Sequence, residues 1–164
     1  PPRSTQGVSS AASDVYKRQG LKTLEIYQRD NVLGLAKHLA ELAQKRMSDW
    51  AEKYSIVSEV RSLGLLMGLS VTDPTHSDIP EKESPEAELA NSYMARSVRN
   101  EMLKNGVWAI CDMEPTVRLY PALNMNQQVL LEGLEITEAA IATIEKKGNT
   151  VGDYPALPTG VVGF

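Results

Sequence analysis

Apolar residues recur at three- and four-residue steps along several parts of the chain, most regularly over residues 31–54. This spacing predicts an amphipathic helix with Asn31 as its N-terminal cap. The same period predicts the last turns of a helix over residues 20–30, a helix from Pro85, capped by Ser84, to residues 105–106, and a final helix from Asn126 to about Lys147. The positions expected to face the core are Val32, Leu35, Leu39, Leu42, Met47, Trp50 and Tyr54 over 31–54, then Leu89, Ala90, Met94, Val98, Met102 and Leu103, and finally Leu130, Leu134, Thr137, Ile141 and Ile144.

Four short stretches have the pattern of strands. Residues 56–61 alternate and residues 63–71 are almost continuously apolar, which predicts a β-hairpin that turns near residues 62–64. Residues 107–111 and 116–120 predict two further strands, and residues 72–84 between the pairs predict an exposed loop followed by the helix at Pro85. This order of elements is typical of an α+β fold in which helices cover a small sheet of about four strands.

The two ends of the chain lack such patterns. Residues 1–19 show no helical or strand period, and from Asp14 they read DVYKRQ, which resembles the translation of a transposon-based sequencing adapter. We therefore expect residues 1–19 to be non-native or, alternatively, a natural disordered tail, and the folded domain to span residues 20–148. If the adapter interpretation holds, the genuine chain is a C-terminal piece of something larger. Residues 149–164 contain three glycines and two prolines, so we expect a tail that wraps a surface.

Composition narrows the classes of function. A chain of 164 residues with 42% hydrophobic and 23% charged residues has the balance of one globular domain. One cysteine excludes an internal disulfide framework, and with only two histidines it leaves too few ligands for a zinc site. A net charge of −4 gives no basic footprint for nucleic acid, and no apolar run is long enough to span a membrane. We expect a cytoplasmic protein with neither nucleic acid nor a membrane as a partner.

The sequence contains no glycine-rich phosphate loop, no GxSxG motif and no HExxH motif. We therefore expect no catalytic residue and no metal ligand within this chain. Cys111 follows an apolar stretch without a neighbouring base, which indicates a small buried hydrophobe rather than a nucleophile. His38 and His76 are interpreted as solvated surface residues.

Two arginines stand apart. Arg118 is the only charged residue in the apolar stretch TVRLYPAL, so its guanidinium should face either solvent or an anion. A planar guanidinium suits a two-pronged grip on a carboxylate. Arg61, at the mouth of the predicted hairpin, either does the same or pairs with Glu59. Arg118 is therefore a candidate anion-binding residue, with a solvent-facing surface arginine as the alternative.

The segments EVRSLGLLMGLSV and TVRLYPALNMNQQVLLEGLEITEAAI, in this order, resemble the C-terminal small domain of the class III aminotransferases, pyridoxal-phosphate enzymes of fold type I. The resemblance covers essentially residues 20–147. In the first motif Ser62 stands where the family usually has glycine, and in the second Ala122 replaces a common proline. The matching positions are Arg61, Leu65, Val117, Arg118, Leu119, Pro121 and Leu123.

This resemblance implies a longer homodimeric enzyme, below called the parent enzyme, that uses pyridoxal 5'-phosphate to transfer an amino group from an amino acid or amine, an ω-amino acid among them, to a 2-oxo acid. It implies that Arg118 binds the substrate carboxylate. The lysine that holds the cofactor would precede residue 20, so we expect this chain alone to bind no pyridoxal phosphate and to be inactive. The lysines that lack the family's lysine context are Lys22, Lys37, Lys45, Lys53, Lys82, Lys104, Lys146 and Lys147. The alternative is a stand-alone α+β ligand-binding or regulatory module.

Overall fold

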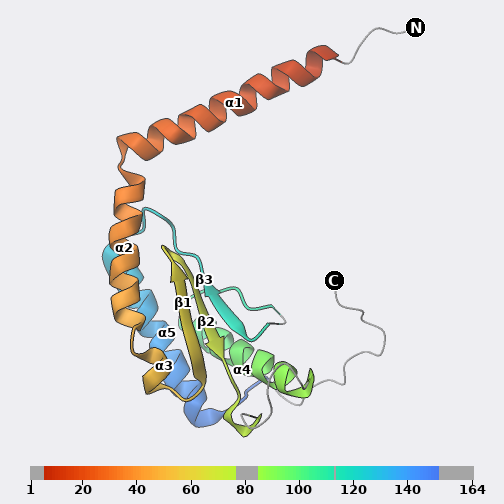
Figure 1. The fold of residues 1–164 in the computed structure, drawn as a ribbon, viewed down its shortest axis with the longest axis vertical. Coiled ribbons are helices and arrows are strands. Elements are labelled where there is room, and N and C mark those ends of the chain that lie inside the picture. Colours follow the sequence, from red (N-terminus) through yellow and green to blue (C-terminus); the bar gives the residue numbers. More distant parts are fainter. Residues whose placement is uncertain (1–5, 77–84, 113, 152–164) are drawn as a thin grey trace, which may run out of the picture.

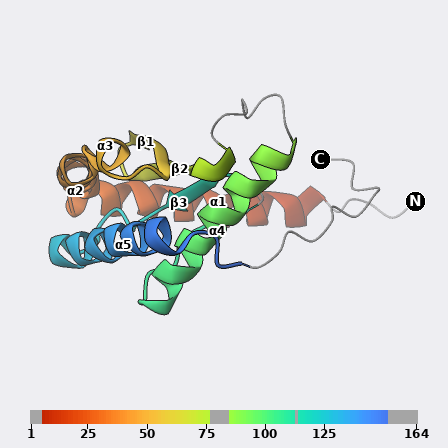
Figure 2. The same cartoon turned by 90° about the horizontal axis from the view of Figure 1, so that it is seen from below.

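The computed structural model describes residues 6–76, 85–112 and 114–151, in which helices cover one face of a small antiparallel sheet. The strands pair in the order β1-β2-β3, so β2 is central (Figure 1). Figure 2 shows α4 and α5 together on one side of the strands. The predicted α+β architecture is confirmed. The elements are α1 (Gln6–Arg29), α2 (Val32–Met47), α3 (Trp50–Lys53), β1 (Val57–Leu63), β2 (Leu66–Val71), the 3-10 helix η1 (Pro74–His76), α4 (Pro85–Lys104), β3 (Thr116–Leu119) and α5 (Gln127–Lys147).

The core lies between the sheet and the helices. Alternate residues of β2 and β3 are buried, because successive side chains of a strand point to opposite faces. In α5 all five positions predicted to face inward are buried, and the helix is bounded as predicted by Asn126 and Gly148. The Asn126 side chain accepts a hydrogen bond from the Gln128 amide, which satisfies one free donor of the first turn. The buried residues of β2 and β3 are Met67, Leu69, Val71, Val117 and Leu119.

The single helix expected over residues 31–54 is divided in two. Asn31 occupies the N-cap position, but its backbone is left-handed (φ 48°) and its side chain makes no capping hydrogen bond. Asparagine tolerates this conformation, which lets the chain change direction sharply between α1 and α2 (Figure 1). Leu35 and Leu103, both predicted to face the core, are 45% and 46% exposed.

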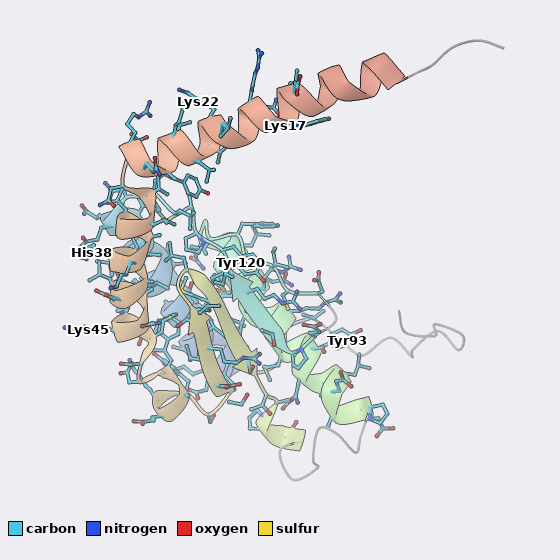
Figure 3. All side chains as sticks on the ribbon, turned by 45° about the horizontal axis from the view of Figure 1, so that its top comes forward. Lys17, Lys22, His38, Lys45, Tyr93 and Tyr120 are labelled. Carbon is cyan, nitrogen blue, oxygen red and sulfur yellow. The ribbon has the colours of Figure 1, made fainter. Side chains whose placement is uncertain are left out.

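Helix α1 corrects the expectation that residues 1–19 form no regular element, since it begins at Gln6. No proline interrupts residues 6–29, and alanine, lysine, arginine and glutamine extend an existing helix at little cost. The helix projects away from the sheet, and Lys22 points outward from it (Figures 1 and 3). Leu21 and Leu24 are 61% and 60% exposed. The domain boundary at residue 20 stays a prediction.

The described residues form three strands rather than four. Of residues 107–111, only Ile110 joins the sheet, where it exchanges two backbone hydrogen bonds with Arg118 (3.1 and 2.8 Å). The next hydrogen-bonded pair outward would be Trp108 with Tyr120, but β3 ends at Leu119 and no such pair forms. Trp108 is accordingly 71% exposed.

The structure describes only part of the predicted loop over residues 72–84 and of the predicted tail over residues 149–164. Residues 77–84, including the expected cap Ser84, and residues 152–164 lie outside the described residues. At the start of the tail, the Thr150 amide donates to Ser97 Oγ on α4 (2.9 Å). Within the described ranges, the helices are too short or too polar for a membrane crossing.

Candidate functional site

The core fixes the direction of Arg118. Its neighbours in β3, Val117 and Leu119, are 0% and 8% exposed and face the helices. Because side chains alternate along a strand, the Arg118 side chain lies on the opposite face of the sheet. The burial of β3 therefore places the candidate residue on the face that the helices do not cover.

The structure brings the two candidate arginines into one row across the sheet. Gly68 of β2 is the pairing partner of Arg61 in β1 and of Arg118 in β3. Directly paired residues of an antiparallel sheet point to the same face, so both arginines lie on the uncovered face with only a glycine between them.

Each arginine already has acidic partners. Arg118 Nη1 lies 3.4 Å from Asp112 Oδ2, and Arg118 Nη2 donates to Glu114 Oε2. Arg61 Nε lies 3.3 Å from Glu59 Oε2, and its Nη2 donates to Ser70 Oγ (3.2 Å). Arg61 thus follows the alternative in which it pairs with Glu59.

The sequence pattern did not indicate the partners of Arg118, because residues 112–115 between the two predicted strands were assigned no role. Two acidic residues in the turn directly before an arginine-bearing strand are the signal that could have found them. The Arg118 side chain is 25% exposed, whereas those of Asp112 and Glu114 are 70% and 65% exposed. The guanidinium is therefore half-enclosed and its carboxylate partners reach it from the solvent side.

Two cavities flank Tyr120 and Pro121 at the end of β3. One, of about 490 Å³, lies between α5, residues 105–110 and the end of β3, and Arg118 contributes to its wall. The other lies between α2, the β1–β2 turn and the same two residues. Figure 3 places Tyr120 at the end of the sheet nearest α1.

The cavity beside Arg118 is not a site for pyridoxal phosphate by itself. Its described lining is mostly apolar and contains no lysine, while the second cavity contains Lys37 but no arginine. A Schiff-base cofactor needs a lysine amine and a grip on its phosphate. The described residues that line the two cavities do not provide this combination.

The remaining sequence candidates behave as structural or surface residues. Cys111 is buried, and burial raises the pKa of its thiol, an effect that the nearby Arg99 and Arg96 only partly oppose. A thiol that stays protonated at neutral pH is a poor nucleophile. His38 is exposed and its Nε2 lies 3.3 Å from Gln127 Oε1, while the side chain of His76 lies outside the described residues. Among the described residues, no group of acidic, histidine or cysteine side chains could hold a metal ion.

A buried carboxylate was also missed. Glu138 of α5 is 8% exposed and accepts hydrogen bonds from Lys53 Nζ (2.6 Å), Tyr54 OH (3.0 Å) and Arg46 Nη2. Burial alone would raise the pKa of Glu138, but these three hydrogen bonds outweigh it and hold the pKa below its ordinary value. Its burial could have been inferred from its position in the sequence, because it lies four residues after Leu134 and three before Ile141, on the buried face of the helix. This cluster joins α2, α3 and α5 and lies apart from Arg118.

The curated proteins with similar sequences include a racemase and a transaminase. The chain is 25% identical over 134 residues to an alanine/serine racemase of Pyrococcus horikoshii, covering 82% of this chain and 26% of the relative. It is 26% identical over 146 residues to a succinylornithine transaminase of Citrobacter koseri, covering 89% of this chain and 32% of the relative. The chain thus spans about a quarter to a third of the curated relatives it matches.

Solved structures show the same fold. A taurine:2-oxoglutarate aminotransferase from Bifidobacterium kashiwanohense, determined with pyridoxal phosphate and glutamate, aligns with a TM-score of 0.64 at 16% identity, over 77% of this chain and 27% of that one. The profile of the class-III aminotransferases matches residues 17–141, which include both arginine-bearing strands and most of α5. The chain therefore belongs to the class-III aminotransferase family.

Proposed function

We propose that this chain is the C-terminal part of a class III aminotransferase that transfers an amino group from an amino acid or amine to a 2-oxo acid, and that Arg118 binds the substrate carboxylate. The observation that carries the proposal is the position of Arg118. Buried neighbours hold its backbone, and its half-enclosed guanidinium lies on the uncovered face of a sheet that belongs to this family.

The chemistry of the guanidinium supports this role. It cannot lose its proton at physiological pH, and its planar fork offers a carboxylate two parallel hydrogen bonds. Binding through Arg118 would orient a substrate as well as attract it, which is the contribution that positioned groups make to catalysis. In this proposal residues outside the chain hold pyridoxal phosphate, and the parent enzyme is a cytoplasmic homodimer, as the family resemblance implies.

A second candidate activity is amino-acid racemisation. It is favoured by one observation, the match to an alanine/serine racemase over 82% of this chain. The two activities differ in their need for a partner substrate, because transamination consumes a 2-oxo acid and racemisation does not. Incubating the parent enzyme with one enantiomer of an amino acid and no 2-oxo acid separates them, since only a racemase inverts it catalytically.

The proposal is tested first by extending the source DNA upstream of residue 20. An open reading frame that runs into a lysine-bearing domain supports an aminotransferase, whereas a start codon immediately before residue 20 supports the stand-alone module. The family match favours the first outcome.

The role of Arg118 is then tested in the parent enzyme with Arg118→Ala. A charged, forked hydrogen-bond pair is worth about 1.5 to 3 kcal/mol, so kcat/KM for carboxylate-bearing substrates should fall roughly tenfold to a hundredfold or more, and Arg118→Lys should recover only part of it. Simple primary amines, which lack a carboxylate, should lose far less. Arg61→Ala is the matched control in the same cross-strand row. Equal losses for both substrate classes would show that Arg118 is structural.

A further inference from the structure

We propose that the tail of this chain, residues 152–164, docks apolar side chains into the cavity between α5, residues 105–110 and the end of β3, below called the α5 cavity. The sequence predicts that the tail covers a surface, and this cavity is the surface that fits it. The contact lies within the chain, so it does not depend on the proposed function.

The α5 cavity is large, and apolar side chains are exposed around it. Its volume is about 490 Å³. Trp108, Tyr120 and Val129, which all line it, are 71%, 53% and 53% exposed. Exposed aromatic and apolar side chains that gather around one cavity are typical of a surface that another apolar group covers.

The tail has the composition that such a cavity requires. Residues 152–164 follow the region that the class-III profile matches, residues 17–141, so the contact would be an addition to the matched region. The tail contains a single charged residue, Asp153, and several large apolar ones. The large apolar residues of the tail are Tyr154, Leu157, Val161, Val162 and Phe164.

The start of the tail is fixed within reach of the cavity. The Thr150 amide donates to Ser97 Oγ (2.9 Å), which lies 3.1 Å from Asn149 Oδ1, so the chain after α5 lies against the middle of α4 (Figure 2). The end of α4 leads to Asn105 in the cavity wall, about 12 Å from Ser97 along the helix axis. An extended chain of the length of residues 152–164 spans up to about 43 Å, which is enough to reach the cavity from this anchor.

Tethering favours the tail over other occupants of the cavity. A segment that is joined to the same chain by a short flexible linker has an effective concentration of about a millimolar. A second copy of the chain at micromolar concentration competes poorly with such a segment. A contact of a few apolar side chains is therefore enough to keep the cavity occupied for most of the time.

Trp108 reports this contact, because the chain contains only two tryptophans and the other, Trp50, is fully buried. Quenching of tryptophan fluorescence by acrylamide is compared between the full chain and a chain that ends at Val151, and Trp108→Phe in both gives the contribution of Trp50. If the effective concentration is about twice the dissociation constant, the tail covers Trp108 for about two thirds of the time, so its removal should raise the quenching of Trp108 about threefold.

A synthetic peptide of residues 152–164 tests the same contact between separate molecules. Added at millimolar concentration to the shortened chain, it should restore the protection of Trp108. A peptide of equal length with serine at the large apolar positions should not restore it, because it keeps the backbone and the charge but has no side chains to bury. Equal protection by both peptides would overturn the proposal.

The cavity itself is tested with Val129→Asp, which places a charge in its wall. Leu33→Asp is the matched control, because Leu33 is 67% exposed, lies like Val129 in the first turn of a helix and is not among the described residues that line the cavity. An aspartate is tolerated in a first turn, and circular dichroism verifies that both variants keep the fold. Val129→Asp should raise the quenching of Trp108 in the full chain by a factor similar to tail removal, and Leu33→Asp should leave it unchanged.

Three results would overturn the proposal. Unchanged quenching of Trp108 on tail removal would show that the cavity is open in this chain and left to a partner outside it. Equal effects of Val129→Asp and Leu33→Asp would show that the added charge acts without the cavity. Protection of Trp108 that increases when the protein concentration is raised about tenfold would identify a second copy of the chain as the occupant.

Discussion

Replacing Glu138 by glutamine should loosen the junction of α2, α3 and α5. The carboxylate is almost fully buried and receives donors from Arg46, Lys53 and Tyr54. Glutamine has nearly the same shape but presents one oxygen and an NH₂ group, which faces donors rather than acceptors. The substitution therefore leaves at least one cation without its partner.

The size of the effect follows from the exposure of those partners. Charged hydrogen bonds contribute about 1.5 to 3 kcal/mol each, and breaking a fully buried ion pair costs about 3 to 5 kcal/mol. The Arg46 and Lys53 side chains are 36% and 51% exposed, so water can replace part of what they lose. We expect Glu138→Gln to lower the free energy of unfolding by about 1 to 3 kcal/mol, or Tm by roughly 2 to 10 °C.

The pH dependence provides a second signature. The pKa of Glu138 is lower in the folded chain than its ordinary value of about 4.3. The stability that the ionised carboxylate adds to the fold is therefore fully present above the ordinary value, and it is lost as the pH falls through the folded-state pKa. The stability difference between wild type and Glu138→Gln should therefore be largest at neutral pH and should shrink at about pH 3.

Urea unfolding followed by circular dichroism, at neutral and acidic pH, measures both quantities. Glu135→Gln, an exposed position on the same helix, is the matched control and should change little. If Glu138→Gln were as stable as wild type at pH 7, or if the difference were the same at both pH values, the reasoning about this ion cluster would be refuted.

Three further outcomes are expected. Mixing the chain with pyridoxal phosphate should give no stoichiometric adduct that borohydride traps at a single lysine, and such an adduct would contradict our assignment of the cofactor lysine to residues outside the chain. Deleting residues 1–19 should change the free energy of unfolding by well under about 1 kcal/mol, because the described side chains from Asp14 to Gln19 are exposed, and a large loss in a thermal melt would contradict this. Asn126→Ala should destabilise the chain by about 1 kcal/mol through loss of the α5 cap, measured by urea unfolding against Asn124→Ala, an exposed loop control that should have little effect.

The elements that were predicted well are those in which pattern and boundary signals agree. In α5 the apolar period, the cap at Asn126 and the stop at Gly148 all indicate the same helix. In the β1–β2 hairpin, Gly64 adopts a positive φ of 60° at the turn, which suits the residue that the pattern placed there. Local rules suffice in these segments because tertiary packing reinforces them.

The elements that were predicted wrongly depend on partners that the pattern does not report. An apolar run such as residues 107–111 is a possible strand, but it becomes one only if a neighbouring strand offers N–H and C=O groups at the right register. The neighbouring strand β3 ends at Leu119, one residue beyond Arg118, so it offers no further partners. Helix α1 shows the opposite case, since a segment without amphipathic period still extends a helix already formed.

The candidate site likewise combines features that the sequence predicts with features that it does not. Alternation along β3 is sufficient to predict that Arg118 points away from Val117 and Leu119, and the structure agrees. The row that joins Arg61 to Arg118 through Gly68 depends on strand register, which the sequence alone did not provide. The partners of Arg118 depend on how the turn before β3 closes, and hydrophobic patterning carries no information about that.

The burial that fixes the position of Arg118 is separate from the ion pairs that its side chain makes. Val117 and Leu119 fix the backbone of β3, because a slip of one residue would expose both and bury a guanidinium. The pairs with Glu114 and Asp112 are largely exposed and contribute little to holding the strand. Substitutions at Glu114 should therefore leave the free energy of unfolding almost unchanged, whereas Val117→Ala, at a fully buried position, should lower it, and urea unfolding of the two variants measures the difference.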